Sequence, residues 1–547
     1  MKFRKSHCLA VLALTASICI SPYADACTDI IVGRLASIDG SVITSHTGCC
    51  QECRVHYVPA RTFPAGAMAP VYWGLQDVRK PIDQYGEIIG YIPQVENTYA
   101  YFHSGYSHIN EHQLAIGEST LSQKDELIVT RQTGGQIMTI EQAQAFALQR
   151  CKTAHQAIIL ITSLVEQYGF LPSCDNGSEA LCIADPQEAW VLEVFSVGPG
   201  WTADSGKLGA IWAAQRVPDD HVTMVPNWSV IKQIHLGDPD FLASKNYQQV
   251  AIDHGWYDSD SGEPFVWQKV YSPTPREWAT GRFWLFFTTV APNLKEWPDR
   301  SLKGPFSSSD PYHQYVEDVS IYPFSVKPEK KMSVQDVIAF QRSTFEGTIY
   351  DMTSDPDWLV PDSNGAFKKS PLTTPFPTKD MRELLDINYR RNVSRGGYGM
   401  VSQLRSWLPN PVGGVYWLYL DNQYVSTYVP IYAGVQEISP LYKTYDPDNF
   451  SDDSARWAID FVDNLLYLRW QYAVKDLRKL RDPLETSFFA EQAAIDAQAQ
   501  KLLQQDPAAC HRFLTDYSQK SMQKTVKMYQ NLRNLLITKY TNNKLGG

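Results

Sequence analysis

The sequence has 547 residues, of which 44% are hydrophobic and 20% are charged, so the chain is long enough for a large core and is not of the disordered class. Its formal net charge of −10 argues against nucleic acid or an anionic lipid surface as the partner. After residue 26 no segment has the ~18 uninterrupted apolar residues of a membrane-spanning helix, so we expect no membrane span.

The first 26 residues have the pattern of an export signal. A short basic start is followed by an apolar stretch at 8–20 (CLAVLALTASICI) that is too short to span a bilayer. The small residues at 24 and 26 then form the small-x-small pattern that a signal peptidase accepts. We therefore predict a signal peptide at 1–26, a mature chain that begins at Cys27, and a periplasmic or extracellular location.

A cysteine directly after a signal sequence has a second interpretation. In bacterial lipoproteins this residue carries a diacylglycerol, and Leu or a similar residue usually stands three places before it. Here that place holds Ala24, with the charged Asp25 beside it. The alternative that stays open is a lipid-anchored protein that binds peptides without cleaving them.

The remaining cysteines suggest no metal or cofactor. Cys174 and Cys182 flank a short polar loop that a disulfide could close in an oxidising compartment, although the sequence does not determine the pairing. One cluster looks like a zinc knuckle but lacks a second Cys-x-x-Cys pair at the expected distance, so we expect no metal site and no cofactor. The cluster comprises His46, Cys49, Cys50, Cys53 and His56.

Strands and paired helices are predicted to alternate in the first half of the mature chain. Two strands, TDIIVGRL and SVITSHT, flank Asp39-Gly40, which favours a tight hairpin turn. Thr139 with Gln142, and Thr153 with Gln156, have the spacing of capping boxes that open two successive helices. The other predicted strands lie near 98–102, at 114–116, on both sides of Asp185-Pro186 within 181–195, and at 209–216.

The second half changes character twice. A segment rich in Pro, Ser, Thr and Asp at 353–380 predicts a long loop or an interdomain crossing, and a strand-like block follows at 413–428. From residue 454 the pattern is helical, with one apolar stripe and breaks at 482–483 and 506–507. The stripe comprises Trp457, Phe461, Leu465 and Leu468.

Cys27 at a mature N-terminus would carry a nucleophile and a base in one residue. A free α-amine titrates near ~7.7–8 and a thiol near ~8.5, so the amine can accept the thiol proton directly or through water. The sequence has no papain-like Cys-His pair, no Gly-x-Ser-x-Gly elbow and no His-Glu-x-x-His zinc motif. This chemistry therefore favours an N-terminal-nucleophile hydrolase.

Several segments resemble one family. The run CTDIIVGRLASIDGSVITSHT, the segment IPQVENTYAYFHSGYSHINEHQLAIGEST, and later blocks as far as RSWLPNPVGGVYW are similar to the dipeptidase A-type peptidases, which are related to secernins. The resemblance covers the chain from Cys27 to about Ala433. It implies an α+β fold, an αββα N-terminal-nucleophile (Ntn) hydrolase sandwich, that hydrolyses dipeptide amide bonds through a thioester.

The resemblance also implies roles for single residues. Cys27 matches the nucleophile, and Asn110 and Asn227 match asparagines that stabilise the oxyanion. Arg282 matches an arginine that binds a substrate carboxylate or orients the thiol. Many members have an Arg and then an Asp on the second strand, residues that hold the nucleophile, whereas this chain has His46 and Cys49 there. His46 is open to two interpretations, a donor to the thiolate or a structural strand residue that meets a neighbouring carbonyl. We place His46 with Arg282 among the substrate-binding residues.

The sequence thus predicts a signal peptide at 1–26, an Ntn-hydrolase peptidase domain at 27–450 and a helical C-terminal segment at 451–547. The predicted function is an exported cysteine dipeptidase that acts on dipeptides or small amides. An amidase or acylase on N-acyl amino acids is the alternative enzyme, since the same thiol chemistry serves any amide that fits. A homo-oligomer is left open.

Overall fold

The computed structural model describes residues 27–48, 52–75, 86–106, 108–172, 177–273, 277–300, 319–385, 393 and 396–541. The predicted signal peptide, Cys49, Cys50 and Cys174 lie outside these residues. The described chain mixes helices and antiparallel sheets without a barrel, which confirms the α+β class.

Two large antiparallel sheets form the centre of the molecule. The five-stranded sheet contains, in spatial order, β14 (Phe241–Ala243), β12 (Ile211–Val217), β11 (Ala189–Phe195), β10 (Ser178–Ala184) and β9 (Ala115–Leu121). The six-stranded sheet contains β13 (Val222–Val225), β1 (Asp29–Val32), β2 (Val42–Gly48), β17 (Tyr398–Leu404), β18 (Gly414–Leu420) and β19 (Val429–Tyr432).

The two sheets pack face to face, with β2 of one against β9 and β10 of the other. Side chains alternate along β10 as a strand buried on both faces requires. Ala180 and Cys182 join the hydrophobic cluster that contains the six-stranded sheet, whereas Leu181 and Ile183 join the cluster that contains the helices on the other face. Both faces of this sheet are therefore covered.

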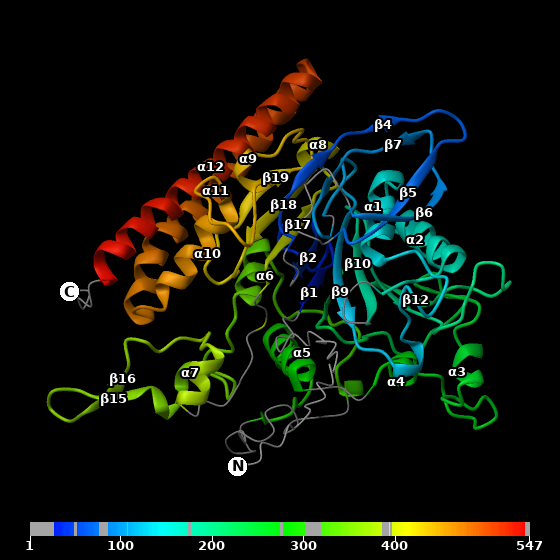
Figure 1. Ribbon diagram of the computed structural model, residues 1–547, viewed down its shortest axis with the longest axis horizontal. Helices are drawn as coiled ribbons and strands as arrows, with labels where there is room; N and C mark the ends of the chain where they lie inside the picture. The colour runs from blue at the N-terminus through cyan, green and yellow to red at the C-terminus, as the bar shows by residue number, and fades with distance from the viewer. Residues whose placement is uncertain are drawn as a thin grey trace, which may run out of the picture.

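Helices cover the two outer faces (Figure 1). The five-stranded sheet is covered by α1 (Ile140–Arg150) and α2 (Ala154–Tyr168). The six-stranded sheet is covered by α6 (Val334–Gln341), α10 (Ala455–Leu466), α11 (Trp470–Gln505) and α12 (Pro507–Tyr540), and α5 (Glu277–Val290) lies beside its β1 end. The layers are thus helix, sheet, sheet and helix.

Smaller elements surround this frame. Two-stranded ribbons pair β3 (His56–Val58) with β8 (Tyr101–His103), β4 (Arg61–Thr62) with β7 (Asn97–Thr98), β5 (Met68–Trp73) with β6 (Glu87–Pro93), and β15 (Leu359–Pro361) with β16 (Phe367–Lys369). Short helices are α3 (Gln249–Asp253), α4 (Trp267–Tyr271), α7 (Lys379–Leu384), α8 (Asn410–Gly413) and α9 (Pro440–Lys443). The segment 353–380, predicted as a loop, contains the β15–β16 ribbon.

Two local predictions at the N-terminal half are corrected. The strands β1 and β2 are joined by residues 33–41 rather than by a two-residue turn, because Gly33, Leu35 and Ala36 are held by backbone bonds to 219–221 before the chain reverses. Thr153 caps α2 through the amide of Gln156, as predicted, but the Thr139 side chain makes no capping bond to α1. There the Gln142 side chain accepts from the Tyr72 amide instead.

The C-terminal helices differ from the prediction in two ways. Asp506 caps α12 as expected, but α11 continues through Pro483. The buried face of α10 contains Ala458, Ile459 and Val462 rather than the predicted stripe. Packing against the sheet explains both differences, since tertiary burial overrides local propensity. The domain boundary at residue 450 stays a prediction.

Candidate active site

Cys27 lies two residues before the first residue of β1, at the end of the six-stranded sheet. Its side chain is buried, with 2% of the residue exposed. The next residue is fixed at both ends: the Thr28 amide donates to the Thr47 hydroxyl at 2.6 Å, and the Thr28 hydroxyl donates to the carbonyl of residue 393 at 2.9 Å. The start of the strand therefore has a defined position.

Arg282 connects Cys27 to Asn227. This fully buried arginine on α5 donates to the Cys27 carbonyl and, at 2.9 Å, to the Thr28 hydroxyl. Its other terminal nitrogen donates to the Pro226 carbonyl at 2.7 Å and to Asn227 Oδ1 at 3.2 Å. One planar guanidinium thus brings together three of the residues predicted from the sequence, because its five donors have a fixed geometry.

Asn227 follows β13 in a left-handed conformation, with φ of 56°. Asparagine adopts this conformation more readily than most residues. Its backbone amide donates to the Ser119 hydroxyl at 3.1 Å, and its Nδ2 donates to the Thr120 carbonyl at 2.8 Å. The side-chain amide of Asn227 is therefore positioned by β9 of the five-stranded sheet and by Arg282 from α5.

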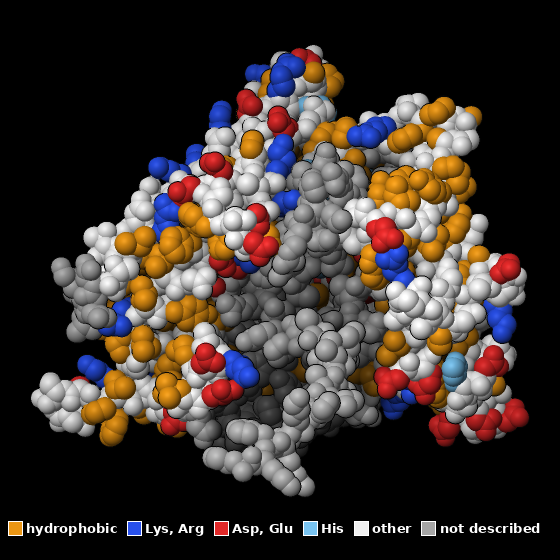
Figure 2. All heavy atoms as spheres, in the orientation of Figure 1, with side chains coloured by type: hydrophobic (Ala, Val, Ile, Leu, Met, Phe, Trp, Pro, Cys, Tyr) orange, Lys and Arg blue, Asp and Glu red, His pale blue; other side chains and the backbone are white. Residues whose placement is uncertain are grey.

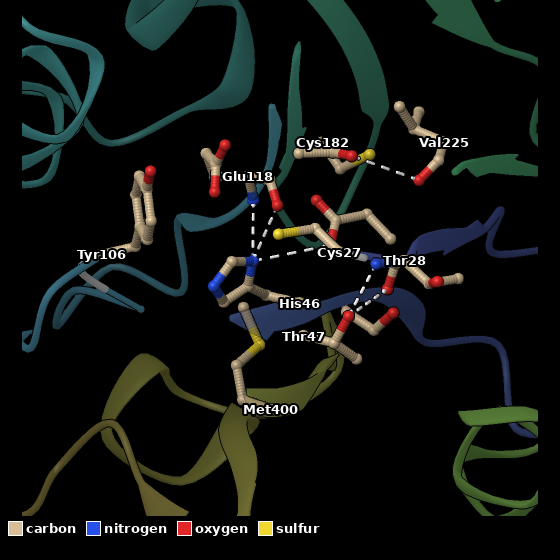
Figure 3. Close-up of polar contacts among 12 residues, drawn as sticks. Cys27, Thr28, His46, Thr47, Tyr106, Glu118, Cys182, Val225 and Met400 are labelled. Carbon is tan, nitrogen blue, oxygen red and sulfur yellow. Dashed lines mark hydrogen bonds and ion pairs between the residues drawn. The ribbon is translucent and has the colours of Figure 1, made fainter. Parts of the chain in front are cut away.

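His46 lies on β2, between the two sheets and next to Cys27. Figure 3 shows the Cys27 side chain extending toward the Nδ1 side of the His46 ring, the side on which the Glu118 backbone also lies. Nδ1 of His46 lies 2.8 Å from the Glu118 carbonyl and 3.1 Å from its amide. The shorter contact favours the tautomer in which Nδ1 donates to the carbonyl, so Nε2 presents a lone pair. Among the described residues no hydrogen-bond partner contacts Nε2.

The electrostatics of this interior favour neutral groups. Burial lowers the pKa of His46, although the charge and backbone carbonyl of Glu118 act in the opposite direction. Burial raises the pKa of the Asp29 carboxyl well above its usual range, against the opposing effects of the Thr47 amide and Arg282. Asp29 Oδ1 lies 3.5 Å from His46 Nδ1. Arg282 is therefore the main positive charge near Cys27.

Asn110 lies apart from this group. Its Nδ2 donates to the carbonyls of Leu148 and Cys151 at 2.9 and 2.8 Å, and its Oδ1 accepts from the amides of His112 and Leu114. Both polar atoms are thus used to fix the turn before β9 against the end of α1. This geometry corresponds to a structural bracing role and gives no contact with Cys27.

The other described cysteines are poor candidates for a nucleophile. Burial raises the pKa of Cys53 and of Cys151 to about 12, and it raises that of Cys182 well above the usual range. Cys182 is a free thiol, so it does not form the suggested bridge, whose other member lies outside the described residues. Within the described ranges no group of three potential ligands could hold a metal ion.

Sequence reasoning missed the threonine and serine hydroxyls that fix the site. Thr28, Thr47 and Ser119 each accept a backbone amide or donate to a carbonyl within the sheets. Their signal was weak, because hydroxyl residues on a strand are common and their partners are distant in sequence. The run of consecutive polar residues at 44–47 in β2 was the one available indication.

Comparisons with known proteins cover most of the chain. The model of Peptidase family C69 matches residues 93–482. Probable dipeptidase B of Streptococcus pyogenes serotype M1 is 23% identical over 99% of both chains, and a probable dipeptidase of Latilactobacillus sakei is 23% identical over 87% of this chain and 89% of its own length. No helix in the described parts is long and apolar enough to cross a membrane. Because the family match spans well over half of its residues, this chain belongs to peptidase family C69.

Proposed function

We propose that the chain is an exported cysteine dipeptidase in which Cys27, freed by removal of residues 1–26, is the nucleophile. The observation that carries this proposal is the guanidinium of Arg282, which bonds to the backbone of Cys27 and to Asn227 at once. Acyl transfer requires a nucleophile and an oxyanion donor at fixed relative positions. The hydrogen bonds of Arg282 fix the backbone of Cys27 relative to the side chain of Asn227. The names of the relatives support the choice of dipeptides as substrates.

The proposed reaction has two steps. The Cys27 sulfur attacks the peptide carbonyl carbon while its proton passes to the α-amine of the same residue, and the C-terminal amino acid leaves with that proton. Water then attacks the thioester, which releases the N-terminal amino acid and restores the thiol. Asn227 Nδ2 donates one hydrogen to Thr120 and has a second hydrogen for the developing oxyanion.

The order of layers supports an Ntn-hydrolase sandwich. Two antiparallel sheets pack between helices, and Cys27 stands at the start of a central strand with its side chain toward the opposite sheet. In this arrangement the newly formed α-amine would lie at the end of the sandwich, beside the start of β1.

Two residue roles change in the light of the geometry. Arg282 is bonded to four acceptors around Cys27, so we assign it to orienting the nucleophile rather than to binding a substrate carboxylate. Asn110 is committed to the turn before β9 and is left out of the proposed oxyanion site. His46, whose Nε2 has no partner among the described residues, stays in the proposal as a substrate contact.

The test combines intact mass with trapping of the intermediate. The exported protein should start at Cys27, and an acid quench during turnover should add the mass of the N-terminal aminoacyl group of the dipeptide, which is the mass of that amino acid less one water. Cys27→Ala should abolish both turnover and the adduct, whereas the matched control Cys510→Ala, at another buried thiol, should retain both.

The same samples distinguish the alternatives. A diacylglycerol on Cys27 would indicate the lipid-anchored protein, and an additional N-terminal residue would remove the proposed base. Faster hydrolysis of N-acyl amino acids than of dipeptides would identify an amidase or acylase. Dipeptide turnover that survives in Cys27→Ala would show that the nucleophile is assigned incorrectly.

A further inference from the structure

A second cavity lies away from Cys27, between the small ribbons and α1. It has a volume of about 360 Å³ and is bordered by the β4–β7 and β5–β6 ribbons on one side and by Phe146 of α1 on the other. Hydrophobic side chains gather on the surface over these ribbons (Figure 2). Met68, at the cavity, is 53% exposed, and Tyr91 on β6 is 56% exposed. The size is in the range of small-molecule sites.

The described wall of this cavity is mainly apolar and aromatic. Tyr72, Tyr99, Tyr101 and Phe146 contribute rings, and glutamine side chains supply the amides. Several of these groups have fixed orientations: Gln149 Nε2 donates to the Tyr101 hydroxyl at 3.3 Å, and the Tyr72 amide donates to a glutamine of α1. An apolar body with few directional polar groups is typical of a preformed ligand pocket.

The charge around the cavity has one sign. Among the residues that the structure describes, the lining includes Arg61 and no Asp or Glu. Behind the wall, Arg150 stacks on Phe146, with its guanidinium 4.4 Å from the ring centre, and donates to Gln94 at 3.1 Å. The ion pairs of the described residues include neither Arg61 nor Arg150, and Arg150 Nε is buried without a hydrogen-bond partner among them.

The charge of the Arg150 guanidinium, which is partly removed from water and has no ion-pair partner among the described residues, is unfavourable in free energy. Burial lowers the pKa of Arg150 to about 10, which expresses how poorly its charge is compensated. Buried charges in proteins are usually paired, because removing them from water is unfavourable. Arg61, which is exposed and is the arginine among the described lining residues, adds to the positive potential. An anionic group in the cavity would stabilise both.

We propose that this cavity is a binding site for a small carboxylate with an aromatic or branched apolar body. The carboxylate would lie toward Arg61 and the amide of Gln94, and the apolar body would contact the tyrosine rings and Phe146. An ammonium group would be disfavoured, since the described lining residues include no carboxylate. The site is separate from the proposed nucleophile, because neither Cys27, Asn227 nor Arg282 lines it.

The experiment uses the full exported protein and two probes of matched shape, 4-phenylbutyrate and 4-phenylbutylamine, in calorimetric titrations. We expect the carboxylate to bind and the amine to bind at least tenfold more weakly. Arg61→Gln should weaken the carboxylate about tenfold or more, as the loss of one charge-assisted hydrogen bond predicts. Ala145→Phe, which fills the cavity from α1, should abolish binding.

Two controls separate this site from the catalytic one. Cys27→Ala should bind the carboxylate as the unchanged protein does, so failure of the proposed peptidase mechanism leaves the test intact. Arg131→Gln removes an exposed arginine that is paired with Glu87 on the neighbouring ribbon, and it should have no effect on binding. Equal binding of amine and carboxylate, absence of binding, or full binding in a folded Ala145→Phe protein would overturn the proposal.

Discussion

Replacement of Arg282 by Gln tests whether this residue orients the nucleophile. The guanidinium bonds to the Cys27 and Pro226 carbonyls, the Thr28 hydroxyl and Asn227 Oδ1, and glutamine can replace at most part of this set. Unpaired buried acceptors cost ~1–3 kcal/mol each, so we expect the free energy of unfolding to fall by about 3–5 kcal/mol. Displacement of Cys27 relative to Asn227 should lower kcat about 100-fold, with a smaller change in KM.

Urea unfolding and dipeptide hydrolysis per folded molecule would measure the two effects. Arg342→Gln is the matched control, because Arg342 also bonds to backbone carbonyls and to a buried carboxylate, Glu485, and has no described hydrogen bond to Cys27, Thr28 or Asn227. It should lose similar stability and retain kcat. If Arg282→Gln kept its kcat, or if Arg342→Gln lost it to the same degree, the orienting role would be refuted.

Three further predictions concern residues near or formerly assigned to the site. In Gly48→Ala the new Cβ would lie 2.9 Å from His46 Nε2 and 2.9 Å from the Tyr398 ring, so His46 should be displaced. The rate of dipeptide hydrolysis should fall at least about tenfold, while circular dichroism should show that the protein still folds. Burial lowers the pKa of His108 to about 3, so the neutral ring contributes stability above pH ~6.5 that is lost as the pH falls toward 3. At pH 5 the free energy of unfolding should be about 2 kcal/mol lower than at pH 7.5 for this reason. His108→Phe should reduce this pH dependence, as measured by urea unfolding at pH 5 and 7.5. Asn110→Ala should lower the free energy of unfolding by about 2–3 kcal/mol, because two backbone carbonyls lose their donor, while kcat per folded molecule should stay within about twofold. A large loss of kcat at unchanged stability would instead support a role for Asn110 at the oxyanion site.

The sequence predicted most elements of the sheets because they are buried and regular. The segments 181–195 and 209–216 have strand composition and are strands β10 to β12. Pro483 led to a wrong break in α11, since the rule that proline ends a helix applies to an isolated helix and this one packs against α12 and the sheet. The stripe on α10 was wrong for a similar reason. Its larger aromatic residues lie at the margins, while smaller residues face the sheet.

The site was predictable only in part. Cys27 and Asn227 follow from local signals and from resemblance, and Arg282 joins them because α5 packs beside the start of β1. That packing depends on contacts more than 250 residues apart, and no periodicity in the sequence encodes it. For Asn110 the structure offers a second interpretation. A residue in a matching motif was assigned to chemistry, although its four hydrogen bonds are all used by a turn.

The position of His46 makes the departure from the family pattern informative. On this strand an arginine would add a second cation beside Arg282, whereas the imidazole is held neutral by burial and bonds to the Glu118 backbone. With Asp29 also disposed to the neutral form, the surroundings of Cys27 have few compensating charges. A new ammonium at the cleaved N-terminus would be poorly stabilised there, and burial of a charged amine lowers its pKa. The base proposed for the reaction would then be free at neutral pH without help from a neighbouring carboxylate.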